Sequence, residues 1–235
     1  MFSLSDTLDT SALTGQYAVS KRLQIQNFLS KDAADLLAGR LEGLPWRLAL
    51  NSGPRHVDLP VDSLPSLGDA RVTAIRAEVR KAAANGFQYL YETFPIADLK
   101  EAGELKEAAL LEIFEFMNSS RVLTRLAEIT GLQADFCDMQ ATRYRPGHFL
   151  TTHSDEAPGK NRRFAYVLSL SPIWRPTWGG QLQFLDEDGR VIEAFVPTYN
   201  ALSVFTVPSP HHVSQVADFA PVDRLSLTGW FRTRS

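Results

Sequence analysis

The sequence predicts a mostly β core of the jelly-roll type, preceded by a helical N-terminal part, in a single structural domain overall. Short apolar segments separated by turn residues fill the chain after residue 132, whereas the segments before it follow a helical period. Parallel strands alternating with helices are not visible, so a Rossmann-like sheet is not expected. We therefore expect a helical region, 1–132, that packs on a β core, 133–235.

Four helices are expected in the N-terminal region. Ser30 can cap the first helix, Gly86 stops the second, and Gly131 ends the fourth. The charged stretch 92–107 is either a lid or a solvated connection. The expected helical ranges are 31–41, 71–85, 104–117 and 120–129.

Eight short strands are expected after residue 132. Two of them, RFAYVLSL and ALSVFTV, are almost continuously apolar, as buried strands should be. Strands of this number and spacing are typical of a sandwich or a jelly-roll barrel. The eight segments are QATRYRPG, HFLTTH, RFAYVLSL, GQLQFL, VIEAFV, ALSVFTV, HHVSQV and RLSLTGWF.

Composition excludes several classes of protein. The net charge of −3 over 235 residues gives no general attraction to nucleic acid or to an anionic membrane surface. No apolar run reaches the roughly 18 residues of a spanning helix, and the N-terminus lacks the features of a signal peptide. The single cysteine, Cys137, cannot form an internal disulfide. We expect a cytoplasmic protein, and the sequence does not indicate its oligomeric state.

A candidate metal site lies in the strand-rich half, at His153-Ser154-Asp155. In an extended segment, residues i and i+2 point to the same side, so an imidazole and a carboxylate can reach one ion. A third ligand from a distant strand would complete a facial triad of two histidines and one carboxylate, which suits non-haem Fe(II). By itself, His-x-Asp is more often a solvated turn. The PHHV segment, with His211 and His212, offers the third ligand.

Arg224 opens the apolar strand RLSLTGWF, and a cation in that position needs an anionic partner. Its planar guanidinium suits a bidentate carboxylate. Thr228 lies four residues after Arg224, on the same face of the strand, and can add a hydroxyl group to the same binding site. The alternative is a salt bridge from Arg224 to Asp218 or Asp223.

The run HSDEAPGKNRRFAYVLSLSPIWRPTWGGQLQF, followed by PHHV and RLSLTGWF, resembles the prolyl-hydroxylase branch of the 2-oxoglutarate/Fe(II) oxygenase superfamily. It is most similar to bacterial relatives of the ribosomal-protein and oxygen-sensing prolyl hydroxylases. The resemblance covers about 139–235. It implies a double-stranded β-helix, which is cupin-like, with Fe(II) as cofactor, 2-oxoglutarate and dioxygen as cosubstrates, and ascorbate as a reductant.

The resemblance also implies roles for individual residues. In the family's H-x-V pattern the ligand stands two places before the valine, which favours His211 over His212. Asp155 is present where related halogenases lack the carboxylate, so hydroxylation is favoured. Gly179-Gly180 matches a turn before a core strand. The implied catalytic and metal-binding residues are His153, Asp155 and His211; those that bind the cosubstrate are Arg224 and Tyr144, with Thr228 beside them.

The predicted activity is hydroxylation of a C–H bond, with a prolyl residue in a protein or peptide as the leading substrate. Free amino acids or other small molecules are the alternative. A cupin-like metal enzyme without 2-oxoglutarate and a non-catalytic jelly-roll binding module are the rival classes. In the binding module, Trp174 and Trp178 would form a sugar or peptide platform; otherwise they pack or line the entrance. Tyr144 is alternatively a core tyrosine, and His56 and His148 are interpreted as surface or core histidines.

Overall fold

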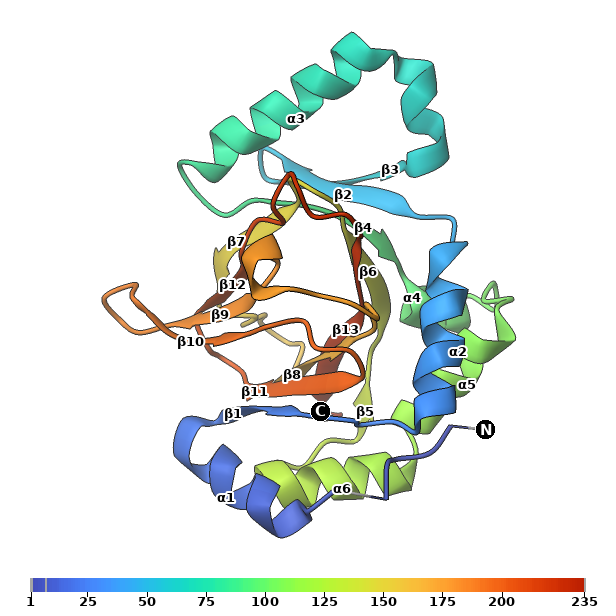
Figure 1. The fold of residues 1–235 in the computed structure, drawn as a ribbon, viewed down its shortest axis with the longest axis vertical. Coiled ribbons are helices and arrows are strands. Elements are labelled where there is room, and N and C mark those ends of the chain that lie inside the picture. The colour runs from blue at the N-terminus through green and yellow to red at the C-terminus, as the bar shows by residue number, and fades with distance from the viewer. Residues whose placement is uncertain (1, 7, 235) are drawn as a thin grey trace.

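A computed structural model describes residues 2–6 and 8–234 of the chain. Within them, 13 strands form one sheet that curls into a nearly closed barrel, with helices along its outside (Figure 1). Every strand pair is antiparallel. The predicted fold class, a mostly β jelly roll with a few helices, is confirmed.

The strands are short, as the sequence predicted. All eight expected segments form strands, and β1 to β5 add five that were not expected. Their bounds are β1 Arg22–Ile25, β2 Arg47–Ser52, β3 Arg55–Pro60, β4 Tyr89–Phe94, β5 Phe136–Cys137, β6 Gln140–Tyr144, β7 Phe149–His153, β8 Arg162–Ser169, β9 Leu182–Leu185, β10 Val191–Phe195, β11 Ala201–Thr206, β12 His211–Val213 and β13 Arg224–Arg232.

The order of the strands explains how distant segments meet. The sheet runs β1-β11-β8-β13-β6-β4-β7-β12-β9-β10, β2 joins β4 to β3, and β5 pairs with β13. Strands from the N-terminal part therefore belong to the same sheet as the core strands. The division of the chain at residue 132 stays a prediction.

The four expected helices are present and differ from the predicted ranges at their ends, whereas α1 and α4 were not expected. In α6, the Ser119 side chain accepts a hydrogen bond from the Val122 N–H, and Gly131 closes the helix at φ 71°. Ser30 is the N-cap residue of α2, as predicted, but its side chain makes no capping hydrogen bond. The bounds are α1 Thr10–Ser20, α2 Lys31–Glu42, α3 Asp69–Ala83, α4 Ile96–Glu101, α5 Ala108–Met117 and α6 Ser120–Thr130, with 3₁₀ turns η1 Val61–Leu67 and η2 Pro176–Trp178.

The helices cover the outside of the barrel. In Figure 1, α1 and α6 lie together beneath β1, α2 and α5 lie along one side, and α3 crosses beyond the β2–β3 hairpin. The stretch 92–107 contains the end of β4 and all of α4, with Phe94 and Ile96 buried in the core. It is therefore a packed connection rather than a lid. Among the described residues, no helix combines the length and apolarity needed to span a membrane.

Candidate metal centre and active site

Three predicted ligands meet at the junction of β7 and β12. His153 ends β7 and His211 begins β12, and the two residues are direct partners across the sheet, with ring centroids 4.1 Å apart. The Asp155 carboxylate lies 3.2 Å from His153 Nε2 and 3.5 Å from His211 Nε2. One potential ligand atom from each residue lies within 4.8 Å of the others. This arrangement can hold a single metal ion on one face.

Asp155 does not lie on the same strand as His153, contrary to the prediction from the sequence, because β7 stops at His153. Asp155 lies beyond it with φ at 63°, a left-handed conformation that aspartate tolerates better than most residues. The turn, rather than strand alternation, brings its carboxylate back over the two imidazoles.

Hydrogen bonds orient both imidazoles. A carbonyl oxygen can only accept, so the Nδ1–H of His153 donates to the Thr151 carbonyl at 3.0 Å, and that of His211 donates to the Ser209 carbonyl at 2.7 Å. Each Nε2 is then left with a lone pair on the side of Asp155. Such backbone hydrogen bonds fix the tautomer of metal-binding histidines.

Burial sets the charge state of the cluster. It lowers the pKa of His211 to about 4, so this imidazole is neutral at pH 7. Burial opposes ionisation of Asp155, but its close contacts with His153 and His211 outweigh it, and the pKa of this carboxyl falls below its usual value. Neutral imidazole and ionised carboxylate are the forms that bind metal.

His212 is not part of this cluster. Its Nε2 lies 2.8 Å from the amide oxygen of Gln183 on β9, and the side chain is half-buried. Neighbouring residues in β12 face opposite sides of the sheet, so only one of the two histidines can meet His153. The geometry therefore favours His211 over His212 as the third candidate metal ligand, as the sequence predicted.

Arg224 is buried at the start of β13, with 3% of its surface exposed. Its Nη1 donates to Ser226 Oγ at 3.3 Å, and its Nε has no partner among the described atoms. No salt bridge joins it to a described carboxylate; Asp223 instead lies 3.9 Å from Arg143. The alternative of a salt bridge to Asp218 or Asp223 was therefore wrong. Burial lowers the pKa of Arg224, as expected for a cation without a counter-charge.

Tyr144 lies beside Arg224, whereas Thr228 lies four residues further along β13, opposite Gln140. Tyr144 is the direct partner of Arg224 across β6 and β13, and the guanidinium carbon stands 5.0 Å above the phenol ring. Burial raises the pKa of Tyr144, so its hydroxyl stays protonated. The Thr228 hydroxyl donates to the Tyr166 carbonyl at 2.8 Å. Both residues line the same cavity as Arg224.

One cavity of about 680 Å³ connects the metal cluster to Arg224. Sequence reasoning missed the wall that β4 supplies: Tyr89 and Tyr91, with Phe87 just before the strand. The alternation in FQYLY carries this signal, because residues two apart share a face. Arg162 and Trp230 also line the cavity, with the guanidinium carbon 3.5 Å from the centre of the Trp230 ring. No local pattern in the sequence indicated that Arg162 and Trp230 would line the cavity.

The Gly179-Gly180 turn lies close to Arg224. Both residues have positive φ, at 68° and 63°, as the sequence predicted. A Cβ on Gly180 would lie 3.0 Å from Arg224 Cδ and 3.1 Å from the Trp174 ring. The turn therefore packs directly against the arginine side chain.

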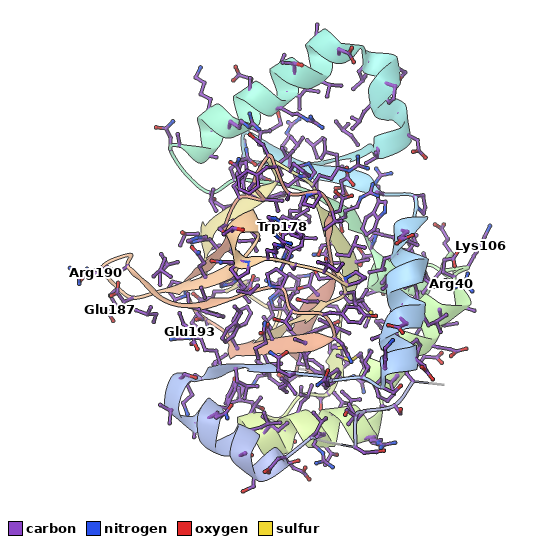
Figure 2. All side chains as sticks on the ribbon, viewed as in Figure 1. Arg40, Lys106, Trp178, Glu187, Arg190 and Glu193 are labelled. Carbon is purple, nitrogen blue, oxygen red and sulfur yellow. The ribbon has the colours of Figure 1, made fainter. Side chains whose placement is uncertain are left out.

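The two tryptophans near this turn are packing residues. Trp174 and Trp178 contact each other edge to face at 5.6 Å, and the Trp174 indole N–H donates to the Gly179 carbonyl. Trp178 points into the molecule, whereas Glu187 and Arg190 project from the β9–β10 hairpin (Figure 2). Neither tryptophan lines the cavity, so they form neither its entrance nor a platform within it.

Comparison with known proteins agrees with this geometry. Residues 139–232 match the model of the 2OG-Fe(II) oxygenase superfamily. They contain the metal cluster, Tyr144, Arg224 and Thr228. This segment of the chain is thus similar to the 2OG-Fe(II) oxygenases, and it holds every predicted residue of the candidate site.

Two kinds of relative are similar to the chain. Prolyl 3-hydroxylase OGFOD1 from Mus musculus is 33% identical over 114 residues, which cover 45% of this chain and only 20% of the mouse protein. A prolyl-4-hydroxylase from Pseudomonas putida matches with a TM-score of 0.58 and 21% identity, covering 96% of this chain and 100% of that one. A prolyl hydroxylase from Trichoplax adhaerens, solved with a hypoxia inducible factor peptide, gives a TM-score of 0.62 at 14% identity, over 95% and 88% of the two chains. These two solved structures share the fold of this chain.

Proposed function

We propose that the protein is an Fe(II)- and 2-oxoglutarate-dependent dioxygenase that hydroxylates a prolyl residue in a protein or peptide, releasing succinate and carbon dioxide. The observation that carries the proposal is Arg224, a buried cation with an unpartnered Nε in the same cavity as the metal cluster. A buried charge requires an anionic partner, and the distal carboxylate of 2-oxoglutarate supplies one. The prolyl substrate is inferred from the relatives described above.

The residues present fit the metal. His153, Asp155 and His211 offer two imidazole nitrogens and one carboxylate oxygen, the donor set typical of non-haem Fe(II) oxygenases. When bound, Fe(II) with 2-oxoglutarate supplies the oxygen activation that breaks an unactivated C–H bond. The chain itself holds the ligands in place through the hydrogen bonds of His153 and His211 to backbone carbonyls.

The remaining cavity residues position the cosubstrate and exclude water. Arg224 would bind the distal carboxylate, with Tyr144 held against it by their cross-strand pairing. Apolar side chains surround the space between Arg224 and the metal cluster, which limits water near the reacting atoms. These side chains are Leu150, Ala165, Val167, Leu182, Phe205 and Val213.

The predicted cytoplasmic location suits this chemistry, because a reducing compartment keeps iron ferrous. Cys137 is the single cysteine and is buried, with its thiol pKa raised by burial. It is therefore not an exposed nucleophile competing for the metal.

The proposal is tested by measuring conversion of 2-oxoglutarate to succinate with Fe(II) in air, without any acceptor. Slow uncoupled turnover is expected from the natural protein and none from His153→Ala. Anaerobic addition of 2-oxoglutarate to the Fe(II) protein should produce a charge-transfer absorption band. Absence of both the band and the succinate would reject the proposal in favour of a cupin-like enzyme or a binding module.

The substrate is tested by mass spectrometry of peptide and metabolite pools incubated with Fe(II) and 2-oxoglutarate. The expected product is a peptide that gains one oxygen atom on proline. Gain of oxygen by free amino acids alone would assign the small-molecule alternative instead.

A further inference from the structure

A row of aromatic rings runs along the cavity wall. Tyr144 stacks on Tyr91 with centroids 5.1 Å apart, Tyr91 contacts Tyr89 at 5.5 Å, and Tyr89 contacts Phe87 at 5.6 Å. Phe87 in turn lies 5.6 Å from the imidazole of His153. One end of the row therefore lies beside Arg224 and the other beside the metal cluster. Any strong oxidant formed in the cavity has phenol rings close by.

Tyr89 differs from a simple wall residue because it has a base. Its hydroxyl lies 2.5 Å from His56 Nδ1, and His56 Nε2 lies 3.1 Å from the Asp58 carboxylate. In the neutral tautomer whose hydrogen lies on Nε2, the nitrogen that faces the Asp58 carboxylate, His56 Nδ1 accepts the hydrogen bond of the phenol. The phenol proton of Tyr89 can therefore move to His56, where Asp58 would stabilise the imidazolium.

The other two tyrosines of the row have no such partner. The polar neighbour of the Tyr91 hydroxyl is the side-chain amide of Gln140, which is not a proton acceptor at neutral pH. Tyr144 lies beneath the Arg224 guanidinium, whose charge opposes the loss of an electron from the ring. Of the three phenols, Tyr89 is thus the one that most readily loses an electron and a proton together.

Solvent can reach this proton acceptor. The His56 side chain on β3 lines the cavity and is 54% exposed, whereas Tyr89, which lines the same cavity, is 8% exposed. His56 therefore lies where the cavity opens to solvent, and small reductants in solution can approach the His56–Tyr89 pair there. The pair connects the cavity to the surface.

We propose that Tyr89 is a redox-active tyrosine that, with His56 and Asp58, protects the site during turnover without an acceptor substrate. The inference rests on the proposed function, because the oxidant forms at the metal when dioxygen and 2-oxoglutarate react. Restoring the ferrous site would take two electrons, and these would pass one after the other through the Tyr89 phenol. Each time the hydroxyl proton moves to His56 Nδ1 and leaves a neutral tyrosyl radical. A thiol or ascorbate from solution returns each electron to Tyr89 and His56 returns each phenol proton, while two protons from solvent release the remaining oxygen atom as water.

A photochemical experiment tests the tyrosine without iron. The metal-free protein is flashed with a ruthenium tris-bipyridine oxidant and persulfate, and tyrosyl radicals are recorded by high-field electron paramagnetic resonance. The natural protein should give a radical whose g-values show a hydrogen bond. That component should be lost in Tyr89→Phe, should change its g-values in His56→Gln, and should remain in Tyr199→Phe.

Tyr199 is a matched control because its hydroxyl donates to Asp35, outside the cavity. A hydrogen-bonded radical of equal yield in Tyr89→Phe would overturn the inference.

A second experiment tests protection. Each protein turns over 2-oxoglutarate in air without acceptor, and the rate at which succinate formation decays is measured with and without ascorbate. Tyr89→Phe should inactivate severalfold faster than the natural protein and Tyr199→Phe, and ascorbate should protect it less. Equal inactivation rates would overturn the role of Tyr89 alone. Absence of succinate from every protein would overturn the proposed function, and this role with it.

Discussion

Arg224 shows how a single buried charge can identify a binding site. It lies at the start of an apolar strand, its ring neighbour is Tyr144, and its Nε has no partner. A folded chain tolerates such a group when a ligand completes it, because an unpaired buried charge costs several kcal/mol. The residue therefore contributes more to ligand binding than to stability.

Substitution of Arg224 should separate these two contributions. Arg224→Gln should weaken 2-oxoglutarate binding by about 30-fold or more, since loss of one partner from a buried charge pair costs roughly 2–5 kcal/mol. The free energy of unfolding of the ligand-free protein should not fall. Titration of the anaerobic Fe(II) protein with 2-oxoglutarate measures the affinity. Arg190→Gln, on the exposed β9–β10 hairpin, is the matched control and should bind as the natural protein does. Equal affinity in both variants would contradict the assignment.

The adjacent histidines of β12 provide a second test at this scale. His211→Ala should abolish stoichiometric Fe(II) binding, because its Nε2 faces Asp155, whereas His212→Ala should retain it, because its Nε2 faces Gln183. Equilibrium dialysis followed by metal analysis measures the stoichiometry. Loss of iron from the His212 variant, with iron retained in the His211 variant, would reverse the ligand assignment.

At the scale of elements, the site depends on turns as much as on strands. The loop after β7 carries Asp155 in a left-handed conformation, and the Gly179-Gly180 turn before β9 packs over Arg224. A strand can present only one side chain in two to the cavity. One turn therefore supplies the candidate ligand Asp155 and the other packs against Arg224, and strand alternation alone would provide neither.

Gly179 should be the less replaceable glycine of its turn. A Cβ at this position would lie 2.0 Å from the Gln215 carbonyl oxygen, and its φ of 68° disfavours any L side chain. Gly179→Ala should therefore lower the free energy of unfolding by about 2 kcal/mol or more. Gly39→Ala, within α2 and with open space around it, should raise it by about 1 kcal/mol. Urea unfolding of both variants measures the difference, and a stable Gly179→Ala protein would contradict the close packing.

At the scale of the whole molecule, the sequence predicted the β core better than the segments that complete it. The eight core strands are recognisable because they are short segments bounded by turn residues, and two of them are almost continuously apolar. Strands β1 to β4 were missed because they lie among helices, and β5 because it has only two residues. The pairing of β1 with β11 and of β4 with β6 is settled by contacts between segments distant in sequence. The cavity wall formed by Tyr89 and Tyr91 also depends on contacts between segments distant in sequence, because both residues lie on β4.

The candidate site shows the same contrast. His153 and Arg224 could be selected from spacing and residue type, since each chemistry requires a particular side chain, and His211 from the resemblance to the family's H-x-V pattern. The path of the backbone through Asp155 and the His56–Tyr89 hydrogen bond could not, because both depend on how separate segments fold against each other. Local patterns identified ligands, and tertiary structure determines their surroundings.

At the scale of the whole molecule, buried His148 should make the stability of the protein depend on pH. This side chain is 2% exposed, and its Nδ1 has no hydrogen-bond partner. Burial, assisted by the positive charge of Arg76, lowers the pKa of His148 to about 3. The unfolded chain therefore binds a proton near pH 6.5 that the folded protein does not. Stability from this group is present above pH 6.5 and is lost as pH falls toward 3, with a slope of up to about 1.4 kcal/mol per pH unit.

The variant His148→Gln should lack this contribution. Its free energy of unfolding, measured in urea between pH 7 and pH 4, should fall less steeply with acid than that of the natural protein, because glutamine does not titrate. His212→Ala serves as the control for removing a histidine that is only half-buried and hydrogen-bonded to Gln183, and its acid slope should change less. Parallel slopes for the natural protein and His148→Gln would show that His148 gains its proton without unfolding, and would place it in a more accessible position than the fold described above.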